Sequence, residues 1–312
     1  MEYRHLMAFG NSSYIISVPK AWVEKNRLKK GDILVVEEKP NELILTSKDA
    51  SERRRINDVT ISPEGKTIEE FKTEITSLYV NNYDVVTVIN FKDPVAIKEI
   101  FRNLVGMEIV EETASKIVAK DLLDIKEVSL KNIIRRIDII IRSMLSDSVE
   151  LDVNNAESVI GRDKEVNRLS LLGFRTARAA TDNPRLLKMF ETSYWEVMLA
   201  KQIITYLERF GDQVKRIIRT ARDESIDRKW KVRLINLLKD IRENYATVMK
   251  IYYENDKQSA FKAETRTRAF LKECDAFLSA NPNITVARLT EFFQHMIGSM
   301  KGILRTVMEQ ES

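Results

Sequence analysis

Cysteine, glycine and proline are scarce in this chain of 312 residues, which has one cysteine, nine glycines and six prolines. The single cysteine, Cys274, excludes a disulfide within the chain and argues against a thiolate zinc site. We interpret its thiol as a packing group, and its isolation fits a reducing cytosol. The few glycines and prolines, with abundant Glu, Lys, Arg and Leu, predict a mostly helical protein.

Histidines and long apolar runs are also scarce. The two histidines, His5 and His295, lie far apart, and no serine or cysteine stands in a nucleophile turn. The sequence therefore predicts no catalytic triad and no enzyme; carboxylate-only hydrolysis is the one chemistry left open. No apolar run approaches the roughly 20 residues of a membrane span, and the first residues lack the apolar core of a signal peptide. We expect a cytoplasmic protein.

What is present divides the chain into three regions. A composition that is 44% apolar and 31% charged, with a net charge of +4, is typical of a soluble globular protein. Short β patterns fill residues 1–50, strand and helix patterns alternate over 56–125, and 129–312 is helical throughout. A charged linker, residues 51–55, separates the first two regions. The predicted fold class is mainly α, with a small N-terminal β-barrel domain and a short α/β middle segment.

A compact basic run lies in the first region. Five basic residues fall within eleven positions and are opposed there only by Glu24: Lys20, Lys25, Arg27, Lys29 and Lys30. Such a patch is the electrostatic footprint of a small DNA-binding module, and a solvated loop is the alternative interpretation.

Around this run, strand patterns cover 14–18, 33–37 and 43–46, and Pro19 opens a short helix that precedes a Gly31-Asp32 turn. A segment of about fifty residues with such short elements buries too little apolar surface to be stable as a folded monomer. We therefore expect two copies to share one core.

The order of these signals, from GNSSYIISVPKAW at residues 10–22 to the Gly31-Asp32 turn, resembles the swapped-hairpin barrel family typified by AbrB, SpoVT and MazE. The resemblance covers most of residues 3–47 and implies an intertwined homodimer that binds DNA. Several members carry a basic pair in the short helix, where this chain has Val23 and Glu24. The DNA contacts are therefore assigned to other residues: Arg4, Asn11, Ser12, Lys20 and Lys25. Family members also serve only as dimerisation modules or as antitoxins.

The middle region alternates strands at 58–61, 85–89, 108–110 and 116–119 with helices at 68–80 and 94–105. This pattern predicts a small α/β subdomain. It has no phosphate-cradling glycine loop and no nucleophile motif. A spacer or a module that braces a dimer is the expected role.

Turn signals cut the last region into six predicted helices, at 129–147, 154–181, 185–223, 228–255, 257–280 and 284–309. Asp182-Asn183-Pro184 and Asn281-Pro282-Asn283 break the chain before the third and sixth helices, which indicates two three-helix units in tandem. The aromatic pair Tyr194 and Trp195, early in the third helix, is expected to pack in the core.

Within the third helix stands the motif Leu207-Glu208-Arg209-Phe210-Gly211-Asp212. Glu208 and Asp212 are four residues apart, so their carboxylates lie about 40° apart on one helix face, spaced to share a hard or borderline metal ion. Gly211 costs about 1 kcal/mol relative to alanine inside a helix, so a glycine at this position usually marks close packing or access to the backbone.

This motif, with Ala156-Glu157-Ser158-Val159-Ile160-Gly161-Arg162-Asp163 on the second helix, resembles the PhoU family of phosphate-signalling proteins. The resemblance spans residues 129–309. It implies a six-helix fold of two three-helix bundles, clusters of iron or zinc on the carboxylate motifs, and regulation of phosphate uptake through partners. Joined to a swapped-hairpin domain, the whole chain resembles archaeal phosphate uptake regulators.

The second repeat departs from the motif. Its last helix reads His295-Met296-Ile297-Gly298-Ser299, so His295 and Ser299 stand where the first repeat has carboxylates. We therefore carry over one metal site, on the first repeat, with Glu208, Asp212 and Asp163 as ligands and iron, zinc or another divalent ion as the metal.

A charge-paired, solvated face is the alternative to this metal site. Glu208 and Asp212 point away from the apolar stripe of their helix, and Asp212 and Arg216 are spaced as an ordinary i,i+4 ion pair. Asp163, in line with Val159 and Val166, is a carboxylate beside the core and needs a partner.

Two functions follow from these features. In the preferred one, the N-terminal dimer binds operator DNA and the helical domain senses phosphate status, which makes the protein a transcriptional regulator of phosphate uptake. In the alternative, the helical domain docks on a phosphate-transporter ATPase or signalling protein, and the N-terminal domain only dimerises it.

Overall fold

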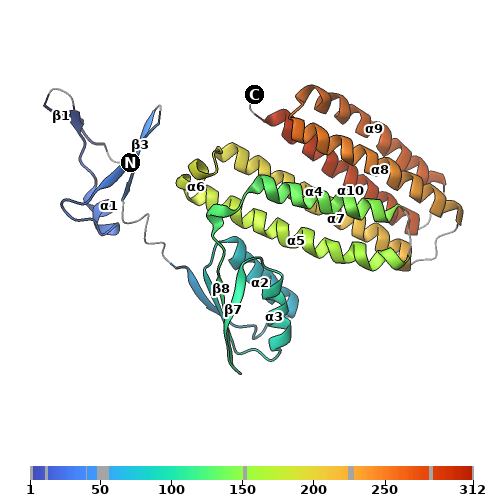
Figure 1. Ribbon diagram of the computed structural model, residues 1–312, viewed down its shortest axis with the longest axis horizontal. Helices are drawn as coiled ribbons and strands as arrows, with labels where there is room; N and C mark the ends of the chain where they lie inside the picture. The colour runs from blue at the N-terminus through green and yellow to red at the C-terminus, as the bar shows by residue number, and fades with distance from the viewer. Residues whose placement is uncertain are drawn as a thin grey trace. The chain divides into compact units, whose positions relative to one another are not determined.

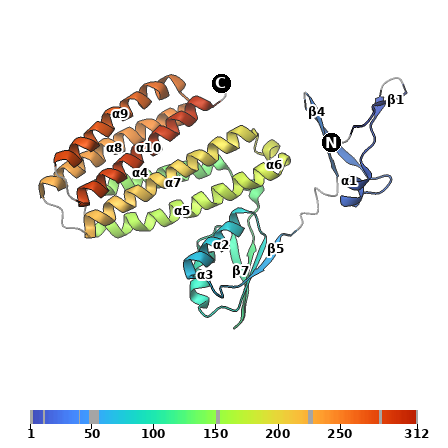
Figure 2. The same cartoon turned by 180° about the vertical axis from the view of Figure 1, so that it is seen from behind.

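The structure is a computed structural model that describes residues 3–10, 13–39, 41–47, 56–149, 153–223, 228–280 and 284–310. The chain divides into two compact units, Met1–Ile56 and Asn57–Ser312, which are described separately. Figure 1 shows their elements, and Figure 2 shows them from behind. Within the described residues, no helix is long and apolar enough to cross a membrane.

The first unit consists of two hairpins and a short helix. Antiparallel pairs join β1 (Met7–Phe9) to β2 (Ser13–Ile15) and β3 (Leu34–Lys39) to β4 (Glu42–Ser47). Between them, α1 (Lys20–Lys25) follows Pro19, as the sequence predicts. The Gly31-Asp32 turn is also confirmed: Gly31 has a φ of 98°, and an oxygen of Asp32 accepts a 2.7 Å hydrogen bond from the Lys29 amide.

Among its described residues, the first unit has no buried side chain. Large apolar side chains on and near its strands are open to solvent; Phe9 is 65% exposed and Tyr14 is 69% exposed. One copy of these hairpins has therefore not formed a core, which agrees with the expectation that fifty such residues need a partner.

The second unit begins with the predicted α/β subdomain. Its four-stranded sheet has the order β5 (Asp58–Ile61), β6 (Val85–Ile89), β8 (Lys116–Asp121), β7 (Met107–Glu112), with β5 parallel to β6 and the other pairs antiparallel. Helices α2 (Ile68–Val80) and α3 (Pro94–Arg102) share a core with the strands. A capping box of Thr67 and Glu70 starts α2, and Asp93 with Pro94 starts α3.

The rest of the second unit is helical, as predicted. Its helices are α4 (Leu130–Ser148), α5 (Val153–Asp182), α6 (Pro184–Met189), α7 (Tyr194–Asp223), α8 (Arg228–Glu254), α9 (Lys257–Ala280) and α10 (Ile284–Glu309). We call α4 to α7 the first half and α8 to α10 the second half. One large apolar core runs through both halves and includes the buried Cys274, in agreement with a packing role for its thiol.

The prediction of one continuous helix over 185–223 is wrong, because the chain breaks between α6 and α7. Glu191 adopts a left-handed conformation with a φ of 48°. Ser193 and Glu196 then form a capping box at the start of α7: the Glu196 amide donates to Ser193 Oγ at 3.1 Å, and the Ser193 amide donates to Glu196 Oε2 at 2.7 Å. Tyr194 and Trp195 follow this break and are 51% and 45% exposed, so the prediction that they pack in the core is also wrong.

A buried arginine on α5 joins the subdomain to the helices. The guanidinium of Arg175 is fully buried, bonds Asp121 of β8 at 2.5 Å, and lies 4.6 Å from the centre of the Tyr79 ring on α2. Its Nε donates to Asn82 Oδ1 at 3.3 Å. Burial raises the pKa of Tyr79 to about 12, so its hydroxyl stays neutral and donates to the Val105 carbonyl. The α/β subdomain is therefore fixed to the first half by a specific polar contact.

Candidate functional site

The predicted carboxylates come together where α5 packs against α7. The core-facing stripe of α7 is buried as expected, with Leu207, Phe210 and Val214 inaccessible to solvent. Asp163 on α5 is only 3% exposed and lies beside Val159 and Val166, which are also buried.

Lys215 of α7 joins two of these carboxylates. Its Nζ lies 2.6 Å from Asp163 Oδ2 and 2.7 Å from Asp212 Oδ1. The predicted pair of Asp212 with Arg216 is present as well, at 2.7 Å. The buried Asp163 thus has the cationic partner that its position requires, and the partner belongs to the chain itself.

Ionisation in this cluster follows from burial and charge. Burial raises the pKa of Glu208, and the nearby charges of Asp212 and Asp163 raise it further. Hydrogen bonds and charge from Lys215 and Arg216 hold the pKa of Asp212 below its usual value against the effect of burial. The pKa of Lys215 is raised by its bonds to Asp163 and Asp212, although burial acts the other way. Of the three carboxylates, Glu208 alone forms no ion pair with a described residue.

These residues fit a metal ion poorly as they are placed. A metal held by Asp163 and Asp212 needs the space between their oxygens, and the ammonium of Lys215 lies there. No group of three or more His, Cys, Asp or Glu side chains in the described part of the chain is arranged to hold a metal. Asp163 Oδ1 is nevertheless buried without a hydrogen-bond partner. Iron or zinc at Glu208, Asp212 and Asp163 stays a prediction of the sequence.

The glycines of the two motifs have different surroundings. A Cβ at Gly211 would touch Val166 at 3.5 Å, an ordinary contact, and a Cβ at Gly298 would meet nothing within 4 Å. The close approach lies one turn further along α10, where a Cβ at Gly302 would clash with the ring of Tyr206. Gly211 is therefore packed against Val166 and Ile141, although a Cβ there would meet them at ordinary contact distances.

The described part of the second repeat offers no comparable cluster. His295 is exposed on α10, whereas Ser299 is buried and 5% accessible. Neither forms an ion pair with a described residue. Sequence reasoning missed Lys215, although its spacing of three residues from Asp212 places the two on one helix face.

The DNA-contact predictions fall on the first unit. Lys20 and Lys25 of α1 and Arg4 are exposed, and Lys20 forms a solvent-exposed pair with Glu24 at 3.6 Å. Asn11 and Ser12 lie outside the described residues. The helix thus presents its two predicted lysines to solvent, with one of them partly neutralised.

The comparisons with known proteins agree with both resemblances. Residues 134–221 match the family model of the PhoU domain. Residues 8–53 match the model described as antidote-toxin recognition MazE, bacterial antitoxin. Both predicted resemblances are confirmed, and the PhoU match covers the first half, from α4 to α7. No curated protein and no solved structure matches the chain.

Proposed function

We propose that this protein is a phosphate-responsive transcriptional regulator that binds DNA as a dimer through its N-terminal unit and controls phosphate uptake. The observation that carries the proposal is the presence, in one chain, of a MazE-type match over residues 8–53 and a PhoU match over 134–221. The first suggests a DNA-binding or antitoxin-type fold, and the second suggests regulation of phosphate. Both are regulatory domain families.

Dimerisation is supported by the apolar surface of the first unit. Its exposed side chains include Leu6, Met7, Phe9, Tyr14, Ile15, Ile33, Val36 and Leu43. Exposed aliphatic and aromatic groups at this density are unfavourable in water, and a second copy that interleaves its hairpins would cover them. A dimer also doubles the basic run, so that two copies of α1 face one duplex.

DNA binding is supported by charge and geometry. Lys25 ends α1, and Lys29 and Lys30 follow in the turn, all exposed. Clustered cations of this kind bind phosphates and release counterions, which provides affinity without sequence readout.

Charge reversal in the full-length protein tests the proposal. We expect the protein to bind duplex DNA from upstream of its own gene and of neighbouring phosphate-transport genes in fluorescence anisotropy. Lys20→Glu with Lys25→Glu should abolish this binding and leave the dimer intact by light scattering. The matched control reverses two exposed lysines of the second unit, Lys72→Glu with Lys92→Glu, and should bind as the wild type does.

The other function that the sequence leaves open is a PhoU-type adaptor that docks on a phosphate transporter or a signalling partner. Its specific support is Glu24, which stands where related helices carry a basic residue and pairs with Lys20. A dimer that binds DNA equally weakly before and after charge reversal would favour the adaptor and exclude the regulator.

A further inference from the structure

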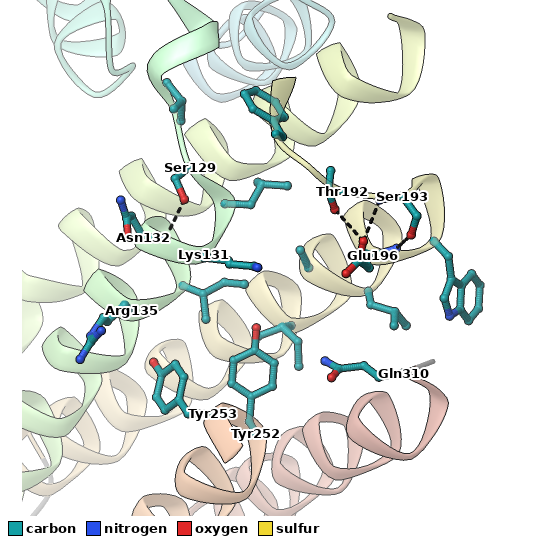
Figure 3. A pocket seen from close by; sticks show the side chains of 18 of the residues that line it. Ser129, Lys131, Asn132, Arg135, Thr192, Ser193, Glu196, Tyr252, Tyr253 and Gln310 are labelled. Carbon is teal, nitrogen blue, oxygen red and sulfur yellow. Dashed lines mark hydrogen bonds between the residues drawn. The ribbon is translucent and has the colours of Figure 1, made fainter. Parts of the chain in front are cut away.

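A cavity of about 930 Å³ lies within the second unit, away from the carboxylate cluster. It opens where the starts of α4 and α7 meet the end of α8 and Gln310, the residue that follows α10 (Figure 3). Its volume is in the range of small-molecule sites, about 300 to 1,000 Å³. Because α4 and α7 belong to the first half and α8 to the second, a ligand that fills the cavity would touch both halves.

The floor of the cavity is apolar. Ile134 of α4 and Leu199 and Ile203 of α7 line it and are almost completely buried. Trp195 stands at the rim, where its Nε1 donates to the Glu309 carbonyl at 3.2 Å and ties the start of α7 to the end of α10. An apolar floor of this kind favours a ligand with an apolar or aromatic body.

The α4 side of the cavity is cationic. Lys126, Lys131 and Arg135 line it, and Lys131 and Arg135 are exposed and form no ion pair with a described residue. Figure 3 shows Lys131 extending from α4 into the opening. Arg142, Arg162, Arg168, Arg178 and Lys215 of the first half pair with acids, whereas Lys131 and Arg135 of the cavity lining form no such pair with a described residue.

The acids at the cavity neutralise these cations only in part. Glu196 faces Lys131 across the opening, but it accepts hydrogen bonds from the Ser193 amide and from Thr192 Oγ1. These bonds hold the pKa of Glu196 below its usual value and fix its carboxylate as the cap of α7. Glu127 is the other acid in the lining. The cavity therefore keeps an excess of positive charge.

The α8 side presents aromatic and amide groups. Tyr252 and Tyr253 project from the end of α8 toward the opening, with Gln310 beside Tyr252 (Figure 3). Tyr253 donates its hydroxyl proton to Asp138 at 3.0 Å. The Tyr252 hydroxyl has no hydrogen-bond partner among the described residues, and burial raises its pKa to about 12, which leaves it a neutral donor.

We propose that this cavity binds a nucleotide, with its phosphates on Lys131, in the positive field of Arg135, and its base between Tyr252 and the apolar floor. Phosphate oxygens match the cations, a planar ring matches the tyrosine face, and Asn255 and Gln310 supply amides for the edge of the base. Inorganic phosphate alone would leave the floor and the aromatic side without contacts. The site would be the effector site of the proposed regulator, and in that sense the inference rests on the proposed function.

Isothermal titration calorimetry on the full-length protein without DNA tests the site, with ATP, AMP, adenosine and inorganic phosphate as probes. We expect a nucleotide to bind more tightly than either adenosine or phosphate. Lys131→Glu with Arg135→Glu should weaken that binding at least about tenfold, because the variant replaces the two cations with carboxylates that repel the phosphates. Both side chains are exposed, so the fold should persist, and an unchanged melting temperature without ligand checks this.

Two further variants sharpen the test. Tyr252→Leu should weaken nucleotide binding and leave any weak phosphate binding unchanged, which separates ring recognition from charge. The control Lys72→Glu with Lys92→Glu removes the same charge from the subdomain and should have no effect.

The proposal is overturned if no probe binds the wild type, if phosphate binds as tightly as the nucleotides, or if the Lys131 and Arg135 variant binds unchanged. Because no DNA is present, these outcomes leave DNA binding by the N-terminal unit standing. Loss of the DNA-binding proposal would in turn leave nucleotide binding standing as a measured property.

Discussion

The two halves of the helical region bury different kinds of polar side chain. In the first half, the buried polar residues include three charged ones, Asp138, Asp163 and Arg175. In the described part of the second half they are neutral: Thr290, Ser299 and Thr306. The hydroxyls of Thr290 and Thr306 bond carbonyls of their own helix.

Each buried charge of the first half contacts a different element. Arg175 bonds Asp121 of the sheet, Asp163 bonds Lys215 of α7, and Asp138 accepts from Tyr253 of α8. Directional contacts of this kind fix how elements sit against one another. In the second half, the polar contacts between α9 and α10 involve partly exposed groups: Lys301 and Arg305 pair with Glu264, and Gln294 donates to Asp275. The PhoU match falls on the first half, where these contacts lie.

The largest loss of stability is expected where the α/β subdomain contacts the helices. Arg175→Met removes the guanidinium and leaves Asp121, whose side chain is 3% exposed, without its cation. We expect a loss of roughly 3 kcal/mol or more in the free energy of unfolding, measured by urea denaturation. Adding Asp121→Asn should recover part of the loss. Equal losses in the single and double variants would contradict a charge-specific join.

The next largest loss of stability is expected at the carboxylate cluster of Asp163, Glu208 and Asp212. Lys215→Met leaves Asp163 buried and unpaired, at a cost of about 2 to 3 kcal/mol, since Lys215 is itself partly accessible. Ser299→Ala, at the position in the second half that corresponds to Asp212, should change stability by only about 0.5 kcal/mol. A similar cost at both positions would remove the distinction between the halves.

The same variant tests the predicted metal. With the ammonium gone, the Asp163 and Asp212 oxygens are open to a divalent cation, so zinc should raise the melting temperature of Lys215→Met more than that of the wild type. Elemental analysis of protein purified without chelator gives the second readout. Iron or zinc bound in stoichiometric amount to the wild type would show that a metal ion displaces the Lys215 ammonium from between the two carboxylates.

A smaller difference in stability is expected between alanine substitutions at two glycines of α10. Gly302→Ala places a Cβ against the Tyr206 ring and should cost about 1 to 3 kcal/mol by overpacking the contact of α7 with α10. Gly298→Ala meets nothing within 4 Å and should gain up to about 1 kcal/mol from helix propensity. Thermal melts of the two variants provide the comparison, and equal melting temperatures would contradict it.

The smallest effect is a pH dependence at Glu208. A raised carboxylate pKa means that ionisation weakens the folded state, so this penalty is present at neutral pH and is relieved as the pH falls toward the ordinary value of 4.5. Glu208→Gln should therefore be slightly more stable than the wild type at pH 7 and equal to it near pH 4. A constant difference across that range would contradict the assignment.

Local signals made much of the fold predictable. Strand β6 and helix α2 have the predicted bounds, because alternation, a capping box and nearby turn residues all agree there. The break before α7 was missed, although Ser193 and Glu196 carry the same capping signal as Thr67 and Glu70. The apolar residues recur at helical spacing on both sides of the break, and this longer pattern predicts one continuous helix in spite of the capping signal.

The candidate site was predictable only in part. The motif and its period brought Glu208 and Asp212 together and placed Asp163 beside the core. The cation that satisfies them was not foreseen, because choosing Lys215 among many surface lysines requires the packing of α5 on α7. Other features involve segments that are far apart in sequence, so no local pattern predicts them. These are the contact of Arg175 with Asp121, the contact of Gly302 with Tyr206, and the cavity at Tyr252.

DNA binding by the N-terminal unit is tested by the fluorescence anisotropy of duplex DNA with the full-length protein, titrated with salt. We expect tight binding that survives competitor DNA and weakens steeply, with a slope of log affinity against log salt of about −0.9 for each phosphate contacted. Affinity that stays weak and nearly independent of salt would contradict this expectation and make the N-terminal unit a dimerisation device alone.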